Sequence, residues 1–435
     1  MYERFLALGL GVTGDAVVRY ARDLDAQITV IEDSPGRDAA YAERVADARS
    51  RGAAVVEAPA PEGLRDLVGA ADVLVPSPGV PAVHPAIAAA RAAGVPVRAE
   101  IDLAAERLGS TPLVAVTGTN GKTTVTTLAT SMLTASGVDA TAAGNIGVPL
   151  LDAAAGKGEV VVAEVSSFQL VFTTEAFRPR VAVLLNLAED HLDWHDSFAD
   201  YAAAKARVFA HQSGDDVLVF NADDPVVARL ATAAPARRMP FTVANVGAGD
   251  IRDHANARAA TMAAGEVGGT PAGIATALRS FEGLPHRMQL VGERAGVRYY
   301  DDSKATNPHA TLAGVEGAAG PVVLIAGGRN KGLDLSALRT LAPRLRGVVA
   351  IGESGAEVAG VFAGVTPVVE AADMRSAVTR AAEQAEPGDA VLLSPACASF
   401  DWYDSYGARG DDFAREVARL LARDPGPWLE RQVTE

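Results

Sequence analysis

Residues 115–124 read Ala-Val-Thr-Gly-Thr-Asn-Gly-Lys-Thr-Thr, between an apolar run and a stretch with a helical pattern. Gly118 and Gly121 allow the backbone to curl so that its N–H groups point at a phosphate. Lys122 adds a positive charge for the outer phosphates, and the Thr123 hydroxyl is suited to binding Mg²⁺. Although a valine replaces the first glycine of the common pattern, the segment predicts a phosphate-binding loop rather than a glycine-rich turn beside a solvated lysine.

The composition is that of a globular protein with several domains. The chain has 435 residues, 49% of them hydrophobic and 21% charged, which is too long for a single core. Charged residues interrupt every apolar stretch and the first residues lack a signal-peptide pattern, so we expect a cytoplasmic protein without membrane insertion. The net charge of −15 argues against a nucleic-acid partner. The single cysteine, Cys397, excludes an internal disulfide.

Apolar runs of strand type alternate with alanine-rich helical stretches, which predicts an α/β fold of parallel sheets covered by helices. We expect three domains: a Rossmann-like domain over residues 1–109, a central phosphate-loop ATPase-type domain over 110–284 and a second Rossmann-like domain over 285–435. Besides the strand before the phosphate loop, the expected strands are residues 5–8, 28–31, 73–75, 160–165, 181–185, 217–221, 297–300, 322–326, 348–351 and 390–393.

A glycine pattern follows the first expected strand. Gly9, Gly11 and Gly14 fit the fingerprint of dinucleotide-binding turns, and Glu32 and Asp33 lie at a suitable distance for a ribose hydroxyl. Taken alone, the pattern indicates NAD, but the same geometry serves any nucleoside diphosphate. A tight turn without a ligand is an equally good interpretation, and the three alternatives stay open at this point.

Acidic and imidazole side chains follow two further strands of the central domain. Glu164 ends an apolar strand beside the phosphate loop, where a Mg²⁺ ligand is expected. Residues 186–193 follow the next strand and contain His191, which is able to ligate a metal ion or hold a phosphate. Glu189 and Asp193 in the same stretch are typical of a surface loop.

A helix is predicted to begin near Ser197, because Ser197 and Asp200 form a capping-box pattern. Tyr201, Lys205 and Phe209 then share one face at a spacing of four residues. From this pattern alone, Lys205 is interpreted as a solvated charge on an alanine-rich helix.

Three polar segments follow strands of the third domain. Residues 301–307, 327–332 and 394–401 lie at the carboxyl ends of the strands, where parallel sheets bind ligands. Cys397 lies in the last of them, and without a basic neighbour in the sequence it is interpreted as a buried thiol rather than a nucleophile.

These motifs, in this order, resemble those of the Mur ligases over nearly the whole chain. Residues 117–124 are similar to the family's shortened phosphate loop, which accounts for the missing first glycine. The segments most similar to the family members that add D-glutamate are 166–170, 301–307 and 394–401. The Asp-Asn-Pro-Arg signature of the member that adds the third residue does not occur.

The chain departs from the family pattern at two places. The segment 241–253 is shorter than usual, which implies a contracted edge of the central domain and leaves the contacts of Asp253 open. Tyr406 stands where the family has an aromatic residue near the C-terminus.

The resemblance implies an ATP-dependent ligase that joins D-glutamate to UDP-N-acetylmuramoyl-L-alanine through an acyl phosphate, with ADP and phosphate as products. It implies that the first domain holds the UDP substrate, the second ATP and the third the amino acid, and that two Mg²⁺ ions are required. It also overturns the interpretation of Lys205 as a solvated charge, since the family's lysine is carbamylated by CO₂ and becomes a metal ligand. We also expect a monomer.

Chemistry and resemblance together assign roles to individual residues. The candidate catalytic residues are Lys122, Glu164, His191 and Lys205. The candidate ATP contacts are Gly118, Thr119, Asn120, Gly121, Lys122, Thr123, Thr124, Asn256, Arg287 and Asp302. One Mg²⁺ is assigned to Thr123 and Glu164, and the second to His191 and carbamylated Lys205. The UDP substrate is assigned to Thr13, Ser77, Asn145 and Ser166, and D-glutamate to Lys304, Thr306, Lys331, Ser399 and Tyr406.

Three alternative functions share part of the pattern. A folate polyglutamylating ligase of the same family has the phosphate loop but does not need the UDP-type first domain. An NAD-dependent oxidoreductase would use residues 9–14 and leave the phosphate loop and Lys205 without a role. A nucleotide-driven switch protein would leave the three polar segments of the last domain unexplained.

Overall fold

The computed structural model describes residues 2–36, 39–243 and 251–422, and of residues 251–254 the backbone only. Within these residues the chain forms two compact units. The first unit extends to Leu187 and includes residues 199–243 and 255–281, and the second holds residues 188–198, 251–254 and 282–422. The expectations for the short segment 241–253 and for Asp253 therefore fall largely outside the described residues.

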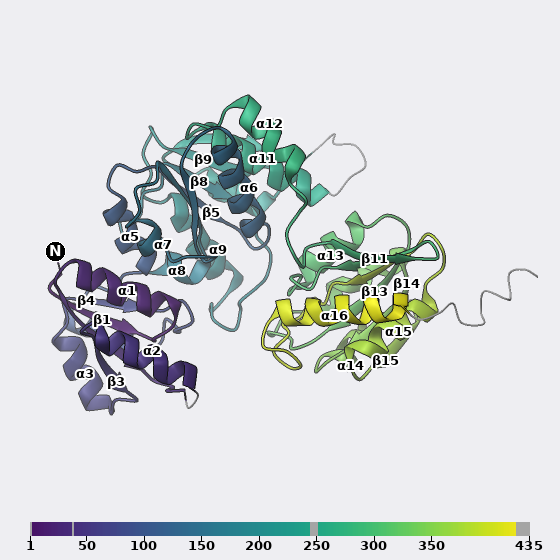
Figure 1. Ribbon diagram of the computed structural model, residues 1–435, viewed down its shortest axis with the longest axis horizontal. Helices are drawn as coiled ribbons and strands as arrows, with labels where there is room; N and C mark the ends of the chain where they lie inside the picture. The colour runs from purple at the N-terminus through teal and green to yellow at the C-terminus, as the bar shows by residue number, and fades with distance from the viewer. Residues whose placement is uncertain (1, 37–38, 244–250, 423–435) are drawn as a thin grey trace, which may run out of the picture. The chain divides into compact units, whose positions relative to one another are not determined.

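The first unit contains two separate sheets, the first of which is built from residues near the N-terminus. It has four parallel strands in the order β3-β2-β1-β4 (Figure 1). Its strands are β1 (Arg4–Leu8), β2 (Gln27–Glu32), β3 (Ala54–Glu57) and β4 (Val73–Pro76). The helices that follow them are α1 (Val12–Asp23), α2 (Ala39–Ser50), α3 (Pro61–Gly69), α4 (Pro85–Ala93) and α5 (Glu100–Leu108).

The second sheet carries the phosphate loop. Six parallel strands lie in the order β10-β9-β8-β5-β7-β6, so β5 is flanked by β7 and β8. Its strands are β5 (Leu113–Thr117), β6 (Ala140–Gly144), β7 (Val160–Glu164), β8 (Val181–Leu184), β9 (Val217–Asn221) and β10 (Arg237–Phe241). Its helices are α6 (Lys122–Ala135), α7 (Leu150–Ala153), α8 (Ser167–Val171), α9 (Phe198–Ala206), the 3₁₀ helix η1 (Arg207–Phe209), α10 (Pro225–Ala231), α11 (Ile251–Gly265) and α12 (Pro271–Ser280). Buried residues of α6, α11 and α12 pack on the strands in one apolar core.

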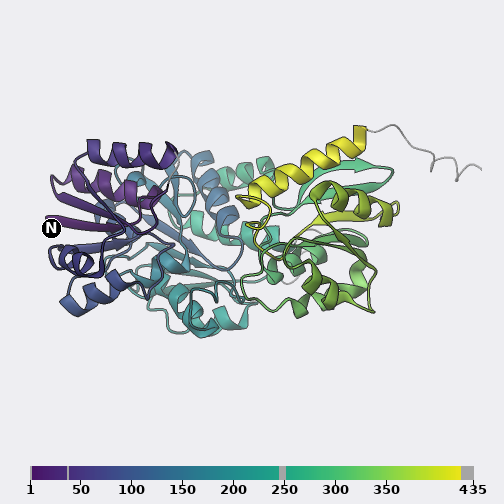
Figure 2. The same ribbon diagram turned by 90° about the horizontal axis from the view of Figure 1, so that it is seen from below.

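The third sheet belongs to the second unit and has six strands in the order β11-β12-β16-β13-β14-β15. Its strands are β11 (Gln289–Arg294), β12 (Val297–Asp301), β13 (Val322–Gly327), β14 (Leu345–Ile351), β15 (Val368–Ala371) and β16 (Ala390–Leu393). Its helices are α13 (Pro308–Gly317), the 3₁₀ helix η2 (Leu335–Arg344), α14 (Gly355–Phe362), α15 (Met374–Gln384) and α16 (Tyr406–Ala422). Two apolar cores lie on its two faces, one under α13, η2 and α14 and the other under α15 and the yellow helix α16 (Figure 2).

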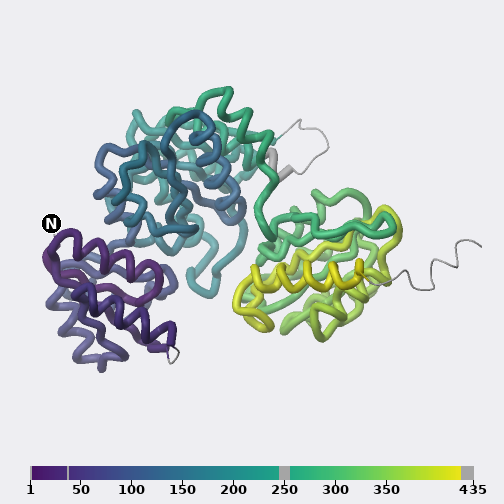
Figure 3. The backbone as a smooth tube through the Cα atoms, viewed as in Figure 1, coloured from purple at the N-terminus to yellow at the C-terminus, as the bar shows by residue number. Residues whose placement is uncertain are grey.

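The α/β class is confirmed, and the chain can be followed through the three sheets in sequence order (Figure 3). The expectation of parallel pairing alone is wrong for the third sheet, because β11 pairs antiparallel with β12. The sequence analysis also missed the strands β3, β6, β10, β11 and β15. Among the described residues, no helix is long and apolar enough to cross a bilayer.

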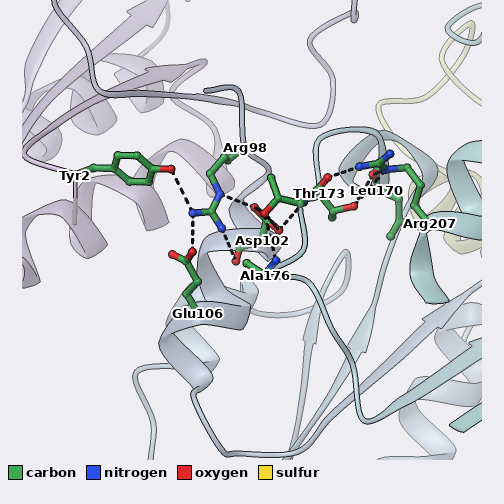
Figure 4. A network of polar contacts seen from close by, with 9 residues as sticks. Tyr2, Arg98, Asp102, Glu106, Leu170, Thr173, Ala176 and Arg207 are labelled. Carbon is green, nitrogen blue, oxygen red and sulfur yellow. Dashed lines mark hydrogen bonds and ion pairs between the residues drawn. The ribbon is translucent and has the colours of Figure 1, made fainter. Parts of the chain in front are cut away.

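A buried network of polar contacts links α5 to the segment after α8 (Figure 4). Arg98 and Asp102, which are 4% and 0% exposed, form an ion pair at its centre. Arg98 also donates to Glu106 at 2.8 Å and to the Tyr2 hydroxyl at 3.4 Å. Asp102 accepts the Thr174 backbone N–H at 2.9 Å. The network therefore joins the segment that follows the first sheet to a loop of the second.

Candidate functional site

The phosphate loop connects β5 to α6 and depends on its two glycines. Gly118 has φ of +154° and Gly121 has φ of +87°, conformations that L side chains rarely adopt. A Cβ atom at position 121 would lie 2.4 Å from Oδ1 of Asn256 in α11. The loop therefore needs glycine both for its backbone shape and for the close approach of Asn256, which places that side chain against the loop.

Asn186, which follows β8, holds the loop from one side. Its Oδ1 accepts the Asn120 N–H at 2.8 Å, and its Nδ2 donates to the Asn120 carbonyl at 3.0 Å. Its own carbonyl accepts the Thr119 N–H at 2.8 Å. The sequence analysis included Asn186 in the segment 186–193 but assigned it no role. Its position directly after a strand that pairs with β5 was the signal that could have identified it.

Positive charge is concentrated where the loop enters α6. Lys122 donates from Nζ to the carbonyls of Gly118 and Thr119, each at 2.9 Å. Thr123 and the buried Thr124 follow in the first turn of the helix, whose N-terminal end favours anions. The Thr119 hydroxyl lies 3.0 Å from the hydroxyl of Tyr201 in α9. The loop therefore combines a cation, a hydroxyl and the N-terminal end of a helix, which is a combination that binds phosphate.

Glu164 ends β7 in direct register with Val116 of β5, so its side chain lies next to the phosphate loop. It is 3% exposed, and its Oε1 accepts Nδ2 of Asn145 at 2.9 Å. Its Oε2 is buried without a hydrogen-bond partner. A buried carboxylate oxygen left without a donor is costly unless a cation occupies the site, so Glu164 fits the role of a Mg²⁺ ligand.

Ser166, assigned to substrate, caps a helix in this structure. Its hydroxyl donates to Oε1 of Gln169 at 2.9 Å and accepts the Gln169 N–H at 3.3 Å, so that the two residues form a capping box at α8. This cap fixes the chain directly after Glu164.

Lys205 lies in α9, which begins at Phe198, one residue after the expected Ser197. The lysine is only 2% exposed, and its Nζ lies 4.7 Å from the ring centroid of Tyr201. The interpretation of Lys205 as a solvated charge, made from helix spacing alone, is therefore wrong. The spacing correctly placed Tyr201 and Lys205 on one face, but it could not show that this face is buried.

His191 belongs to the second unit, as does the rest of the segment 188–198. Its backbone is left-handed, with φ of +56°, and its N–H donates to Oδ1 of Asp190 at 2.9 Å. Asp190 is 5% exposed and accepts Nζ of Lys331 at 2.6 Å and Nδ2 of Asn307 at 3.1 Å. Burial opposes ionisation of Asp190, but Lys331 and His191 outweigh it and hold the pKa of this carboxyl below its ordinary value.

In the first sheet, the glycine turn after β1 is tightly packed. A Cβ at Gly14 would meet the Gly9 carbonyl at 2.0 Å, and the Ser77 hydroxyl donates to the same carbonyl at 3.4 Å. Glu32 Oε2 accepts the Leu10 N–H at 2.9 Å. Asp33 instead pairs with His84 at 2.7 Å, and Thr13 lies half-buried in α1. The turn is thus well formed, and its contacts are compatible with NAD, with another nucleoside diphosphate and with no ligand.

Two polar segments of the third sheet are joined by a buried arginine that sequence reasoning missed. Arg409 in α16 is 1% exposed. It donates to the Ser303 hydroxyl at 2.9 Å, to the Ser303 carbonyl at 2.8 Å and to the Cys397 carbonyl at 3.1 Å. Burial lowers its pKa to about 10. A position in a helix more than a hundred residues after Ser303 gave no signal in the sequence.

The candidates for the amino-acid pocket lie around these segments. Lys304 donates from Nζ to the Tyr406 hydroxyl at 3.1 Å and lies 4.7 Å from its ring centroid. Ser399 is 2% exposed, and Thr306 is half-buried. Lys331 is engaged with Asp190, as described above.

Two candidate ATP contacts also lie in the second unit. The Asp302 carboxylate accepts the Ser394 hydroxyl at 3.0 Å and the Met288 N–H at 3.2 Å. Arg287 is half-buried, and its backbone N–H donates to Leu284 at 3.3 Å. Asp302 therefore holds two motif segments together in this structure.

Cys397 is buried, as expected, and burial raises the pKa of its thiol to about 11. A thiol of this kind is not a nucleophile at neutral pH. Across the described residues, no group of three or more His, Cys, Asp and Glu side chains is arranged to hold a metal ion. Mg²⁺ in phosphate-binding sites usually takes only one or two protein ligands, with phosphate and water completing its shell, so Thr123 and Glu164 remain a fitting pair.

Comparisons with known proteins cover the chain in three parts. The model for the Mur ligase MurD-like N-terminal domain matches residues 3–99, the Mur ligase middle domain matches 116–293, and the Mur ligase glutamate ligase domain matches 286–397. A protein of Desulfatibacillum aliphaticivorans is 40% identical over 97% of this chain and 99% of its own length. The chain belongs to the Mur ligase family.

Several relatives of this Mur ligase carry the same name. The Desulfatibacillum protein and one from Halalkalibacterium halodurans, which is 37% identical over 96% of this chain and 98% of its own length, are both called UDP-N-acetylmuramoylalanine–D-glutamate ligase. Among solved structures, a pseudomurein peptide ligase type C from Methanothermus fervidus has a TM-score of 0.59 at 18% identity, covering 96% of this chain and 100% of that one. FolC of E. coli has a TM-score of 0.54 at 19% identity and covers 74% of this chain and 93% of that one. At these identities the structures support the Mur ligase fold alone.

Proposed function

We propose that this Mur ligase is an ATP-dependent amide-forming enzyme that adds D-glutamate to UDP-N-acetylmuramoyl-L-alanine in the synthesis of a peptidoglycan precursor. The observation that carries the proposal is the 40% identity to curated D-glutamate ligases over 97% of the chain. The match includes all three sheets, so it extends to the parts assigned to the UDP substrate, ATP and the amino acid.

The reaction must bring two anions together, because the substrate carboxylate attacks the γ-phosphate of ATP, the bond to the β-phosphate oxygen breaks and ADP leaves. The amine of D-glutamate then attacks the resulting acyl phosphate, the amide bond forms, and phosphate leaves. Catalysis of this kind depends on positioning and charge neutralisation. Lys122 and the N-terminal end of α6 supply positive charge at the phosphate loop. Asn256 lies against Gly121, which supports its assignment to the nucleotide.

Thr123 and Glu164 are proposed to hold one Mg²⁺, and the orphaned Oε2 of Glu164 supports this assignment. His191 and a carbamate on Lys205 are each proposed as ligands of a second Mg²⁺. Lys205 is 2% exposed, so it faces the interior rather than bulk water, and a carbamate at this position would supply oxygen ligands for a metal. When bound, the ions would neutralise phosphate charge.

Each substrate is assigned to one of the expected domains. The UDP substrate is assigned to residues 1–109, ATP to 110–284 and D-glutamate to 285–435. Thr13, Ser77, Asn145 and Ser166 are proposed substrate contacts. The proposed D-glutamate pocket combines two cations with hydroxyl groups from Lys304, Thr306, Lys331, Ser399 and Tyr406. This composition suits a substrate with two carboxylates.

A folate polyglutamylating ligase is the second candidate. The E. coli FolC structure, determined with DHPP and ADP, covers 74% of this chain. The match of residues 3–99 to a MurD-like N-terminal domain favours the UDP-linked substrate instead. An NAD-dependent oxidoreductase is disfavoured because it would leave the phosphate loop and the buried Lys205 without a role.

The experiment that tests the proposal is phosphate release by the purified full-length protein. Release should require ATP, UDP-N-acetylmuramoyl-L-alanine and D-glutamate together. A folate substrate should not replace UDP-N-acetylmuramoyl-L-alanine, and L-glutamate should not replace D-glutamate. Release with folate and glutamate alone would contradict the proposal. We also infer a cytoplasmic monomer, since ATP and UDP-linked sugars are cytoplasmic metabolites, and sedimentation would test the oligomeric state.

A further inference from the structure

Asp190 has no assigned role, yet it lies at the centre of a buried set of contacts. It is 5% exposed, and each of its carboxylate oxygens has a partner from the second unit. Oδ1 accepts Nζ of Lys331 at 2.6 Å, and Oδ2 accepts Nδ2 of Asn307 at 3.1 Å. These partners come from two different polar segments of the third sheet, at distances of 141 and 117 residues along the chain.

The same carboxylate also fixes the backbone of the next residue. Oδ1 of Asp190 accepts the N–H of His191 at 2.9 Å, which supports a left-handed conformation that is unusual for a histidine. One oxygen atom therefore contacts both the lysine assigned to D-glutamate and the residue assigned to metal. Lys331 has only 17% of its side chain exposed, so the ion pair is shielded from water and is stronger than a surface pair.

We propose that Asp190 is a positioning residue that sets the place of the Lys331 ammonium in the D-glutamate pocket and, through the His191 backbone, the place of the metal-side imidazole. The inference rests on the proposed function. An ammonium has three donors, and Asp190 uses one of them, which leaves Lys331 able to bind a substrate carboxylate from a fixed position. Asn307 in turn prevents the carboxylate from rotating away.

The alternative is that Asp190 competes with D-glutamate for Lys331. The two cases predict opposite changes in the KM for D-glutamate when Asp190 is replaced by Asn. If Asp190 positions the lysine, the Asp190→Asn variant loses a charge-assisted hydrogen bond and binds D-glutamate more weakly. If Asp190 competes, the same change frees the lysine and the KM for D-glutamate falls.

Steady-state kinetics of the full-length enzyme test the proposal. Asp190→Asn should raise the KM for D-glutamate roughly tenfold and leave the KM for ATP within about twofold. In a Lys331→Ala background, the same change should alter the KM for D-glutamate by less than about twofold, because Asp190 acts through the lysine. A lowered or unchanged KM, or independent effects of the two substitutions, would overturn the proposal. Asp196→Asn, an exposed acid in the same segment, is the control and should behave like the wild type.

A comparison of two Asp190 variants tests the link between Asp190 and His191. Asp190→Ala removes the acceptor for the His191 N–H, whereas Asp190→Asn keeps one. The half-saturating Mg²⁺ concentration should therefore rise more in the Ala variant than in the Asn variant. Equal values in the two variants would overturn the link to His191.

Chemical labelling in the absence of metal, ATP and substrate tests the ion pair between Asp190 and Lys331 independently of activity. An amine held by a carboxylate reacts slowly with acetic anhydride, so acetylation of Lys331, followed by mass spectrometry, should be several-fold faster in Asp190→Asn. Lys157, an exposed lysine, should react equally in both proteins. Equal reactivity of Lys331 would overturn the proposal. If the wild type releases no phosphate with D-glutamate, the proposed function fails, and the labelling result still decides whether Asp190 holds the lysine.

Discussion

The ammonium group of Lys122 lies 2.9 Å from each of two carbonyls of its own loop, so it is held in place before any nucleotide arrives. A preorganised charge of this kind needs little rearrangement when phosphate binds, which is what electrostatic stabilisation of a transition state requires. Gly118 and Gly121 give the loop containing these carbonyls its shape, because both have positive φ angles.

Replacement of Lys122 by Ala should lower turnover by roughly 10²-fold or more, because the transferring phosphoryl group loses this partner. The measurement is ATP-dependent phosphate release with both other substrates at saturation. Lys157→Ala, on an exposed lysine, is the control. Near-normal activity of Lys122→Ala would refute the assignment of the loop.

Lys205 allows a test by chemical rescue. Lys205→Ala should be folded but nearly inactive, and short-chain carboxylates should partly restore its activity because they replace the carbamate oxygens. The wild type should show additional density on the Lys205 nitrogen in a high-resolution structure prepared with bicarbonate. An active Lys205→Ala protein would argue against a role for this residue in metal binding.

At the scale of helices and strands, the apolar pattern predicted the interior of each sheet. Every strand that it missed, namely β3, β6, β10, β11 and β15, lies at an edge. Edge strands have one neighbour and are less buried; β11, for instance, contains no buried residue. The edge strand β4 was predicted because it is buried along its whole length.

Some residues of the candidate site could likewise be predicted from the sequence, and others could not. Residues that directly follow strands, such as Glu164 and those of the phosphate loop, were predictable because parallel strands place their carboxyl ends on one edge. The contacts Asp190–Lys331 and Arg409–Ser303 were not, since each joins residues more than a hundred positions apart without a shared pattern. Only the folded chain brings such residues together.

Glu100 couples α5 to α7 and predicts a pH effect on stability. Its Oε1 accepts the Leu151 N–H at 2.6 Å, and burial raises its pKa from 4.5 to about 7. Because the folded-state pKa is the higher one, the stabilisation from its neutral form is complete below about pH 4.5 and is lost as the pH rises through about 7.

Glu100→Gln lacks this titration. Relative to the wild type, the variant should gain up to about 3 kcal/mol in the free energy of unfolding as the pH rises from 5 to 8. Over this range the wild type loses stability, because Glu100 ionises more readily in the unfolded chain than in the folded protein. Melting temperatures of both proteins across this range provide the measurement. A constant difference between them would show that Glu100 has the same pKa in the folded and the unfolded protein, which would contradict the effect of burial.

At the scale of the whole molecule, the buried pair Arg98–Asp102 ties the first sheet's last helix to the second sheet. Asp102→Asn should destabilise the protein by roughly 3 kcal/mol, because it leaves a buried guanidinium without its main partner. Glu106→Ala removes the exposed partner of the same arginine and should cost less than about 1 kcal/mol. Calorimetric unfolding would measure both, and equal losses would contradict the importance of burial here.

The first sheet also offers a test of ligand class. If its glycine turn holds the UDP substrate, titration calorimetry should detect binding of UDP-N-acetylmuramoyl-L-alanine in the absence of ATP. Added NAD should not compete. Tight binding of NAD would instead favour the oxidoreductase and would contradict the UDP assignment.

The segment 188–198 has a further consequence for the integrity of the chain. It is continuous with the first unit at both ends, yet it packs with the second, where Lys331 and Asn307 hold Asp190. If the polypeptide were made as two fragments divided between Phe281 and Glu282, this segment would stay with the upstream fragment and its partners with the downstream one. The two fragments would then bind each other through the contacts of Asp190. A fragment-complementation experiment would measure that binding.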